Sequence, residues 1–451
     1  MTARLDAAVA ALRERPVSAC DKGFGCLAPV SAADLAARHL PLLGGAFTMP
    51  VLVLHETALR QNIEAMAAYC AAAGVSLAPH GKTPMAPQLM ARQLAAGAWG
   101  ITAATIGQVR TYRSFGVPRI LLANELTDRA GIAWLAGELA ADPGFDCYVY
   151  ADSLDGVRLL DSAFGTGRPS ASEQPGGPGR RLPVLVELGF PGGRTGCRTV
   201  RQAVAVAEAV AAAASLELAG AAGYEGGLGH DGEPASLAAV AGFCRELRGL
   251  AELIAARAGD TRSGGAGELI LSAGGSAYFD VVAAELTAGG TGSGRRVVLR
   301  SGAYVAHDHG LYASVAPGGT GRPGPALAPA LELWAQVLSR PEPGLALLCA
   351  GRRDVSFDQG LPVPLQIRRQ DGEQAGDRAG AAGGAGTVAG MRVTRLDDQH
   401  AYLSVPPDAA LAPGDLVALG ISHPCTTFDK WRVIPVVDDE YRVVDAVHTF
   451  F

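Results

Sequence analysis

One lysine of this chain stands in the sequence His80-Gly81-Lys82-Thr83, directly after a short apolar run that ends at Pro79. A helical pattern begins a few residues later, so Lys82 should open a loop between a strand and a helix. Barrel enzymes keep catalytic groups in such loops. A lysine that loses its proton through burial is a nucleophile and can form a Schiff base with a carbonyl compound. Lys82 is therefore the first candidate catalytic residue, and the alternative is a solvated loop lysine.

Two adjacent glycines follow a later apolar run, in Ser272-Ala-Gly274-Gly275-Ser276, and a helical pattern over Ala277–Leu286 comes next. Glycines let backbone N–H groups converge on one point, and a helix N-terminus adds partial positive charge. We therefore predict a phosphate site at Gly274 and Gly275, against the alternative of an ordinary turn.

Another glycine motif, Gly227-Leu-Gly229-His-Asp-Gly232, matches the dinucleotide fingerprint. That fingerprint requires a second strand that ends in an acidic residue about 20 positions later. One long helical pattern follows here instead, so we exclude a nicotinamide site.

His423 and Cys425 stand two residues apart near the C-terminus, in His423-Pro424-Cys425. In an extended segment their side chains face the same way and could reach one ion. Imidazole together with thiolate favours zinc, although the remaining ligands must come from elsewhere or from water. The two histidines of His307-Asp308-His309 are also spaced as metal ligands can be. This segment either supports the metal or the substrate, or it is a structural turn.

Short apolar runs alternate with helical patterns between residues 50 and 310, which predicts a parallel sheet covered by helices. Eight runs favour a closed (β/α)8 barrel of the TIM type, with an open doubly wound sheet as the alternative. The eight expected strands are Val75–Pro79, Gly100–Thr105, Arg119–Asn124, Phe145–Tyr150, Pro183–Gly189, Leu216–Gly223, Glu268–Ala273 and Arg296–Gly302.

After residue 310 the long helical patterns stop and short strands predict a β-rich second domain. The strand Pro50–His55 and the first 45 residues could join that domain. We predict the division 1–49 for an N-terminal segment, 50–310 for the barrel and 311–451 for the β-rich domain. Exposed loops are expected at the glycine-rich stretches Gly165–Arg180, Gly289–Gly294, Ala316–Pro325 and Asp371–Gly386.

Composition narrows the class of protein. The chain has 451 residues, 49% of them hydrophobic, and a net charge of −6 without a basic stripe, which argues against a nucleic-acid partner. No apolar run reaches the ~18 residues of a membrane span. The N-terminus lacks the apolar core of a signal peptide. Eight scattered cysteines fit a reducing cytoplasm.

Taken together, these segments resemble the fold-type III pyridoxal-phosphate (PLP) enzymes, the alanine-racemase-like barrels. Within them the chain is similar to the branch of D-serine dehydratase and D-threonine aldolase. The matching stretches are Pro79–Thr83, Gly100–Gly107, Ile120–Asn124, Gly193–Gly196, Ser272–Ser276, Arg300–Tyr304 and His423–Cys425.

The resemblance implies a role for each site residue. Lys82 would hold the cofactor as a Schiff base with His80 beside it, and His423 and Cys425 would bind the metal. The other cofactor contacts it implies are Gly274, Gly275 and Ser276 on the phosphate with Tyr304 nearby, Tyr224 near the ring, and Arg194 near the ring oxygen or substrate carboxylate. The family builds its site between the barrel of one subunit and the β domain of another, so a homodimer with shared sites is implied.

Three features depart from the family pattern: Pro84 stands where several relatives have histidine, the glycine-rich inserts are long, and Cys425 replaces the aspartate of the aldolases. The last favours water elimination from a β-hydroxy D-amino acid, as in D-serine dehydratase, giving a keto acid and ammonia. Cleavage to glycine and an aldehyde, as in D-threonine aldolase, is the alternative. A racemase and a non-catalytic PLP-binding protein are more distant alternatives. D-Serine, D-threonine and 3-hydroxy-D-aspartate stay open as substrates, and zinc or manganese as the metal.

Overall fold

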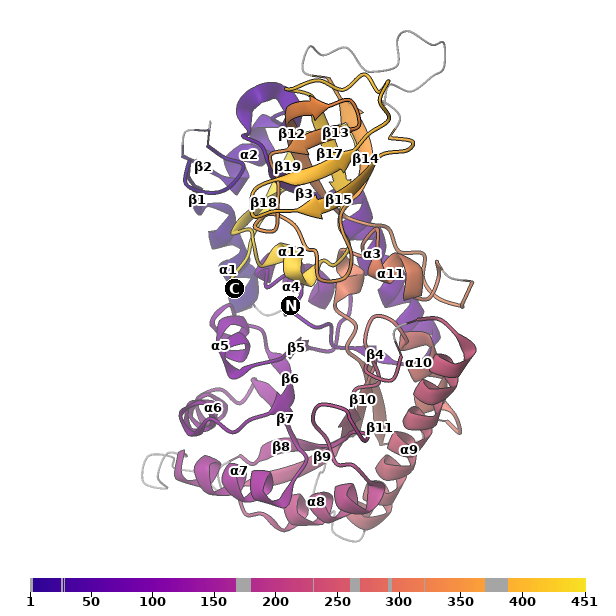
Figure 1. The fold of residues 1–451 in the computed structure, drawn as a ribbon. Coiled ribbons are helices and arrows are strands. Elements are labelled where there is room, and N and C mark those ends of the chain that lie inside the picture. The colour runs from indigo at the N-terminus through magenta and orange to yellow at the C-terminus, as the bar shows by residue number, and fades with distance from the viewer. Residues whose placement is uncertain are drawn as a thin grey trace.

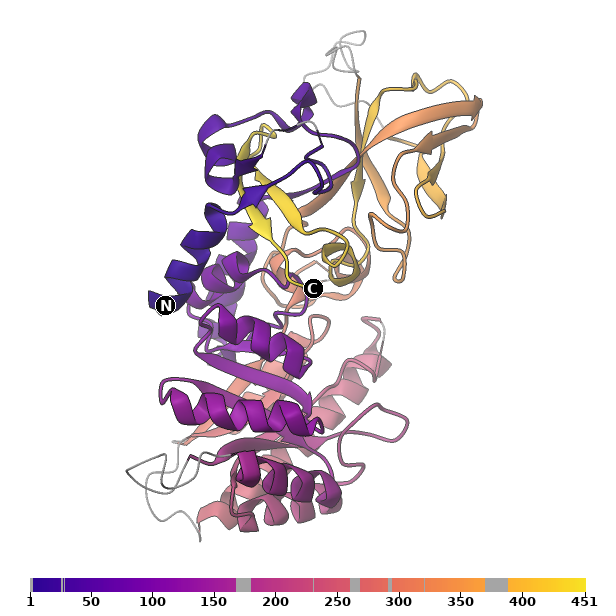
Figure 2. The same ribbon diagram turned by 90° about the vertical axis from the view of Figure 1, so that its left-hand side faces the viewer.

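The protein consists of a barrel with a β-rich domain stacked on one end (Figures 1 and 2). The structure, a computed structural model, describes residues 3–25, 27, 29–167, 180–229, 231–259, 268–290, 294–319, 321–369 and 388–451. Most of the two longest stretches expected as loops, at 165–180 and 371–386, lies outside the described residues.

Eight parallel strands form the barrel, as the sequence predicted. They pair in the order β4-β11-β10-β9-β8-β7-β6-β5, and hydrogen bonds from Trp99, Thr102 and Gly81 join the segment after β4 to β5, which closes the sheet. The strands are β4 (Ser76–Leu77), β5 (Ile101–Ala103), β6 (Arg119–Glu125), β7 (Asp146–Ala151), β8 (Leu182–Leu188), β9 (Leu216–Gly223), β10 (Leu269–Ala273) and β11 (Arg295–Leu299).

Helices cover the outside of this barrel (Figure 1). They are α3 (Glu56–Ala72), α4 (Pro87–Ala95), α5 (Ile106–Ser114), α6 (Arg129–Ala141), α7 (Leu154–Gly167), α8 (Val200–Ala212), α9 (Pro234–Gly259) and α10 (Phe279–Thr287). Several start where a side chain accepts a backbone N–H, as Thr105, Asp128 and Thr199 do. Side chains such as Leu121, Tyr150 and Ile270 fill the barrel interior, so catalytic groups must lie at its ends.

The second sheet contains the five strands that the sequence predicts after residue 310, at Leu331–Leu338, Leu345–Ala350, Val388–Leu396, Ala401–Val405 and Asp415–Gly420. It also contains three that the sequence did not predict, β14, β18 and β19. Its strands are β3 (Val51–His55), β12 (Leu331–Glu342), β13 (Leu345–Leu348), β14 (Val363–Arg368), β15 (Arg392–Leu396), β16 (Ala401–Ser404), β17 (Leu416–Gly420), β18 (Val433–Val437) and β19 (Val443–His448). Its main path runs β15-β16-β13-β12-β3-β18-β19, with β17 bridging β12 and β14.

β3 ties the start of the chain to this later sheet, since it pairs with β12 and β18. α2 (Ala32–Arg38) packs against β19, and α1 (Ala3–Arg13) contacts α4. The division 1–49, 50–310 and 311–451 stays a prediction, but residues 51–55 share a sheet with the later domain. Within the described residues, no helix combines the length and apolar character needed to traverse a bilayer.

Candidate active site

Lys82 lies at the mouth of the barrel, just beyond the C-terminal end of β4. The chain has three lysines. Lys22 donates to Asp354 Oδ1 at 3.0 Å, and Lys430 pairs with Asp429 at 3.3 Å. Lys82 makes no hydrogen bond or ion pair with any residue that the structure describes, and its side chain is exposed rather than buried as expected. Its amine is thus the one lysine amine at the barrel mouth that a carbonyl compound can reach.

His80 is held beside Lys82 in a tight loop. Its N–H donates to Arg300 O, and the Nδ1 atom is buried without a partner among the described residues. Burial, together with the charges of Lys82 and Arg300, lowers the pKa of His80 well below its usual value. His80 is therefore a neutral imidazole at neutral pH. A side chain at Gly81 would lie 2.8 Å from the Tyr112 ring, which explains the glycine between the two residues.

The metal motif meets this loop within a single chain. Cys425 Sγ lies 3.3 Å from Thr83 Oγ1, although the two residues are 342 positions apart. The expected extended segment is wrong in detail, because Cys425 begins the one-turn helix α12 (Cys425–Phe428) and Pro424 already has helical angles, φ −63° and ψ −40°. The turn nevertheless leaves His423 and Cys425 close enough for a hydrogen bond between their side chains.

Asp358 orients the His423 ring, and sequence reasoning missed it. Its Oδ2 atom lies 2.6 Å from His423 Nδ1, and its Oδ1 accepts the Thr426 hydroxyl at 2.6 Å. A carboxylate on one ring nitrogen fixes the tautomer and leaves the other nitrogen for a metal. The residue lies 65 positions from His423 outside any motif, so only its place in space identifies it.

His423 and Cys425 shift the pKa of each other. Burial raises the pKa of the Cys425 thiol, but the hydrogen bond and charge of His423 outweigh this and lower it. Burial would likewise lower the pKa of His423, yet Cys425 and Asp358 raise it to about 9. The thiolate is the ligand form of cysteine. Among the described residues no group of three or more His, Cys, Asp and Glu is arranged for a metal, so two protein ligands are the most this motif supplies.

Arg194 and Tyr224 lie together at the mouth of the barrel. The Arg194 guanidinium carbon sits 4.2 Å from the centre of the Tyr224 ring. Both residues line a cavity of about 190 Å³ with Glu187 at its base. Arg194 is exposed, so its guanidinium can take a carboxylate or an aryl oxygen.

Glu225 occupies the two N–H groups that we predicted to hold a phosphate. Its carboxylate accepts Gly274 N–H at 3.0 Å and Gly275 N–H at 2.6 Å. The remaining donors lie one residue further on, where Ser276 Oγ accepts the Ala303 N–H at 3.2 Å. A phosphate at this turn would therefore meet the Ser276 hydroxyl, beside the short helix η2 (Ala303–Val305), and not the two glycine amides.

The side chains of Tyr304, His307 and His309 have other surroundings. The Tyr304 hydroxyl accepts the Gln93 amide at 3.0 Å in the layer of helices around the barrel. His307 is buried, which lowers its pKa to about 4. His309 lines a separate cavity with His55 and other residues.

Comparison with known proteins agrees with this geometry. Residues 330–437 match the family model described as "Putative serine dehydratase domain". A D-threonine aldolase of Arthrobacter sp is 28% identical over 395 residues, 86% of this chain and 89% of that protein. The crystal structure of D-threonine aldolase from Filomicrobium marinum has a TM-score of 0.70 at 24% identity, over 91% of this chain and 96% of that one. The D-threo-3-hydroxyaspartate dehydratase from Delftia sp. HT23 has a TM-score of 0.68 at 22% identity, over 91% and 99%.

The comparisons support the resemblance predicted from sequence, to the branch of D-serine dehydratase and D-threonine aldolase within the fold-type III PLP enzymes. The (β/α)8 barrel with its β-rich domain and the general class of PLP-dependent lyase are confirmed.

Two more residues of this PLP enzyme lie at the site, and sequence reasoning did not single them out. Arg300 is 5% exposed and donates to Ser272 Oγ and Gly223 O, both at 2.7 Å, beneath the mouth. Burial raises the pKa of the Tyr312 phenol, which keeps it a donor beside Ser276 and Cys425. The stretch Arg300–Tyr304 was among the segments that resemble the family. Its sequence did not indicate whether Arg300 or Tyr304 lies at the site.

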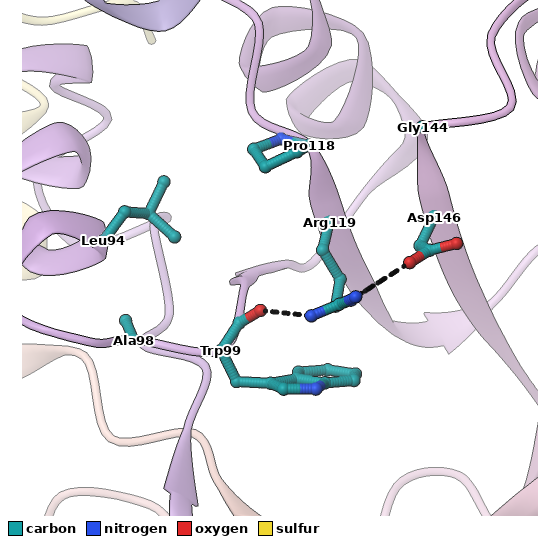
Figure 3. A pocket seen from close by; sticks show the side chains of 7 residues that line it. All are labelled: Leu94, Ala98, Trp99, Pro118, Arg119, Gly144 and Asp146. Carbon is teal, nitrogen blue, oxygen red and sulfur yellow. Dashed lines mark hydrogen bonds and ion pairs between the residues drawn. The ribbon is translucent and has the colours of Figure 1, made fainter. Parts of the chain in front are cut away.

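A second cavity, of about 270 Å³, lies at the opposite end of the barrel (Figure 3). Its Arg119 donates to Trp99 O and to Asp146 Oδ2, both at 3.1 Å, so its polar groups are already paired. Arg119 and Asp146 begin their strands, whereas Lys82 follows the end of one. Side chains at that end of a barrel serve stability, so the chemistry belongs to the other end.

Glu125 and Glu187 face each other at the mouth. Burial, and then the charge of Glu187, raises the pKa of Glu125 to about 9. Both Glu125 oxygens and Glu187 Oε2 are buried without another partner among the described residues. One shared proton lets one carboxyl donate to the other, as two neighbouring carboxylates cannot both ionise at low cost.

This acid pair predicts how stability depends on pH. The folded protein keeps the Glu125 proton up to about pH 9, whereas an unfolded glutamate loses it near ~4.3. The free energy of unfolding should therefore fall as pH rises from about 5 toward 9. Glu125→Gln carries no such proton, so its melting temperature should exceed that of wild type by about 2 °C or more at pH 8, and the gain should shrink toward pH 5. Thermal unfolding of cofactor-free protein measures this, with the exposed Glu233→Gln as control, and an equal gain at both values would contradict it.

Proposed function

We propose that this protein is a PLP-dependent, metal-assisted lyase that eliminates water from a β-hydroxy D-amino acid and releases a keto acid and ammonia. The carrying observation is the 3.3 Å contact between Cys425 Sγ and Thr83 Oγ1. It sets a thiolate and imidazole pair next to the only lysine of the barrel mouth. Racemisation does not require a metal-binding pair such as His423 and Cys425. A non-catalytic PLP carrier does not require the β-rich domain that contains this pair.

The residues at the mouth fit the cofactor. Lys82 offers an amine to its aldehyde, and the buried, neutral His80 flanks that amine. Ser276, whose Oγ accepts the Ala303 N–H, would donate its hydroxyl to the phosphate, since Glu225 takes the two glycine amides. Arg194 and Tyr224 would lie beside the ring.

His423 and Cys425 fit a divalent metal, and zinc suits this pair of ligands best. Asp358 holds Nδ1 of the histidine and so directs its other nitrogen toward the thiolate. Water and substrate oxygen would fill the remaining positions. When bound, PLP draws electrons from the substrate Cα and the metal polarises the β-oxygen.

The side chains then have separable tasks. Lys82 Nζ would take the proton from the substrate Cα. Arg194 holds the substrate carboxylate and thereby fixes which bond to Cα faces the lysine. Tyr312 and Thr83 border the metal motif as hydroxyl donors, so a proton for the departing hydroxyl is close by.

Cleavage to glycine and an aldehyde is the second candidate. The observation that favours it is the 28% identity to a D-threonine aldolase over most of both chains. The same residues would serve, but the β-hydroxyl would lose a proton instead of leaving as water. Cys425 in the metal motif supports elimination as the first choice.

The first prediction concerns Lys82. Borohydride reduction of the PLP-loaded protein should attach the pyridoxyl group to Lys82, because this is the lysine amine open to the barrel mouth. Peptide mapping by mass spectrometry should find Lys22 and Lys430 unmodified. Lys82→Ala should lose the visible absorbance of lysine-bound cofactor. A label on either other lysine would overturn the assignment.

The next prediction concerns the metal. Chelation should stop formation of pyruvate from D-serine, and of glycine and acetaldehyde from D-threonine, while the cofactor absorbance stays. Zinc should restore turnover. Cys425→Ala should lower activity at least tenfold, because a thiolate ligand is lost, and Cys20→Ala at an exposed cysteine should not. Chromatographic product analysis checks both reactions, and full activity in metal-free enzyme would refute the metal.

A further prediction distinguishes an active site built within one chain from an active site shared between two subunits. The homodimer stays a prediction, but Lys82, His423 and Cys425 all come from one chain in the proposed site. A mixture of Lys82→Ala and Cys425→Ala chains should therefore recover no activity even after subunits exchange. Native mass spectrometry of differently tagged chains verifies the exchange. Recovery toward a quarter of wild-type activity or more would show instead that the β domain completes the site of a neighbouring subunit.

A further inference from the structure

Glu225 joins two loops that the proposed cofactor site depends on. It follows β9, while Gly274 and Gly275 follow the neighbouring strand β10. The side chain is 0% exposed, and each carboxylate oxygen accepts one glycine N–H, at 3.0 and 2.6 Å. Hydrogen bonds from N–H groups to a buried carboxylate are charge-assisted and strong. A residue 49 and 50 positions away in sequence therefore fixes the shape of this turn.

The turn is held from its other side as well. Ser301 donates its hydroxyl to Gly275 O at 3.0 Å, and Arg300 donates its N–H to Gly274 O at 3.2 Å. Gly274 has φ +103°, which a side chain would strain. With both carbonyls and both N–H groups engaged, the turn has a single conformation. Ser276 comes next, and its hydroxyl faces the Ala303 N–H.

Two roles are possible for a carboxylate at this place. It could compete with the cofactor phosphate for the glycine amides and swing away when the cofactor binds. It could instead stay bonded and hold the turn while the phosphate binds further on. Release would leave a fully buried charge without its partners, which costs more than the exchange regains. The Ser276 hydroxyl beyond the turn can donate its own hydrogen to a phosphate, so that exchange is unnecessary.

We propose that Glu225 is a positioning residue that clamps the Gly274–Gly275 turn and thereby aims the Ser276 hydroxyl at the cofactor phosphate. This rests on the proposed function only in taking PLP as the ligand. Glu225 then touches neither cofactor nor substrate and acts through Ser276.

Two variants test the clamp. Glu225→Gln keeps the size, but its NH2 group donates where an oxygen accepted, so one glycine amide loses its partner. Glu225→Asp keeps the charge and is one methylene too short to reach both amides. Titration of cofactor-free protein with PLP, followed by absorbance, should give a Kd at least tenfold above wild type for both. Glu217→Gln, an exposed glutamate at the other end of β9, is the matched control and should bind as wild type does.

A double-mutant comparison tests whether Glu225 acts on the cofactor through Ser276. Ser276→Ala should weaken PLP binding, and adding Glu225→Gln should change the Kd by less than twofold more, because both changes remove the same contact. Hydrogen exchange at Gly274 and Gly275 should be faster in Glu225→Gln without cofactor. A merely structural role would give additive losses.

The outcomes divide clearly. Tighter PLP binding by Glu225→Gln, with Glu225→Asp unchanged, would mean that the carboxylate competes with phosphate, and the clamp would be refuted. Binding equal to that of Glu217→Gln would refute it too. If Glu225→Gln did not fold, Glu225→Asp would carry the test. If wild type bound no PLP, the proposed function would fail instead, and hydrogen exchange would still decide whether Glu225 holds the turn.

Discussion

The docking of the β-rich domain on the C-terminal end of the barrel is the constraint on which this site depends. Cys425 touches Thr83, and the last strand and the C-terminal residues beyond it extend the same contact, with Phe450 N–H donating to Met85 O at 3.0 Å and His448 N–H to Gln88 Oε1 at 3.4 Å. The contact brings the exposed Lys82 and the partly buried Cys425 from opposite ends of the chain to the same rim of the barrel.

The concentration of charge at the mouth follows from the barrel itself. Parallel strands deliver the residues after each strand to the same rim, so Lys82, Glu187, Glu225 and Arg300 converge although they are far apart in sequence. Because the interior below is apolar and filled, none of these groups can retreat into water through the barrel. The acid pair Glu125 and Glu187 and the neutral His80 follow from that confinement, whereas His423 favours the thiolate of Cys425 despite its burial.

Periodicity was enough to predict the barrel. Strands buried on both faces are continuous apolar runs, and all eight were found within a few residues of their bounds. The missed strands β14 and β18 each contain a proline, Pro364 and Pro435, which argues against a strand when only sequence is known. β14 and β18 tolerate them because a register shift accompanies Pro364 and because tertiary pairing, not local preference, sets the strand.

By itself the sequence determined the fold, Lys82 and the pair His423 and Cys425, since each depends on residue types within a few positions of one another. Only the tertiary structure decided that Glu225 takes the amides of Gly274 and Gly275, that Asp358 holds His423, and that Tyr304 faces Gln93 instead of the site. These outcomes depend on partners 49 to 211 positions away. Hydrogen bonds at that range follow from how strands pair and loops pack, which no local pattern records.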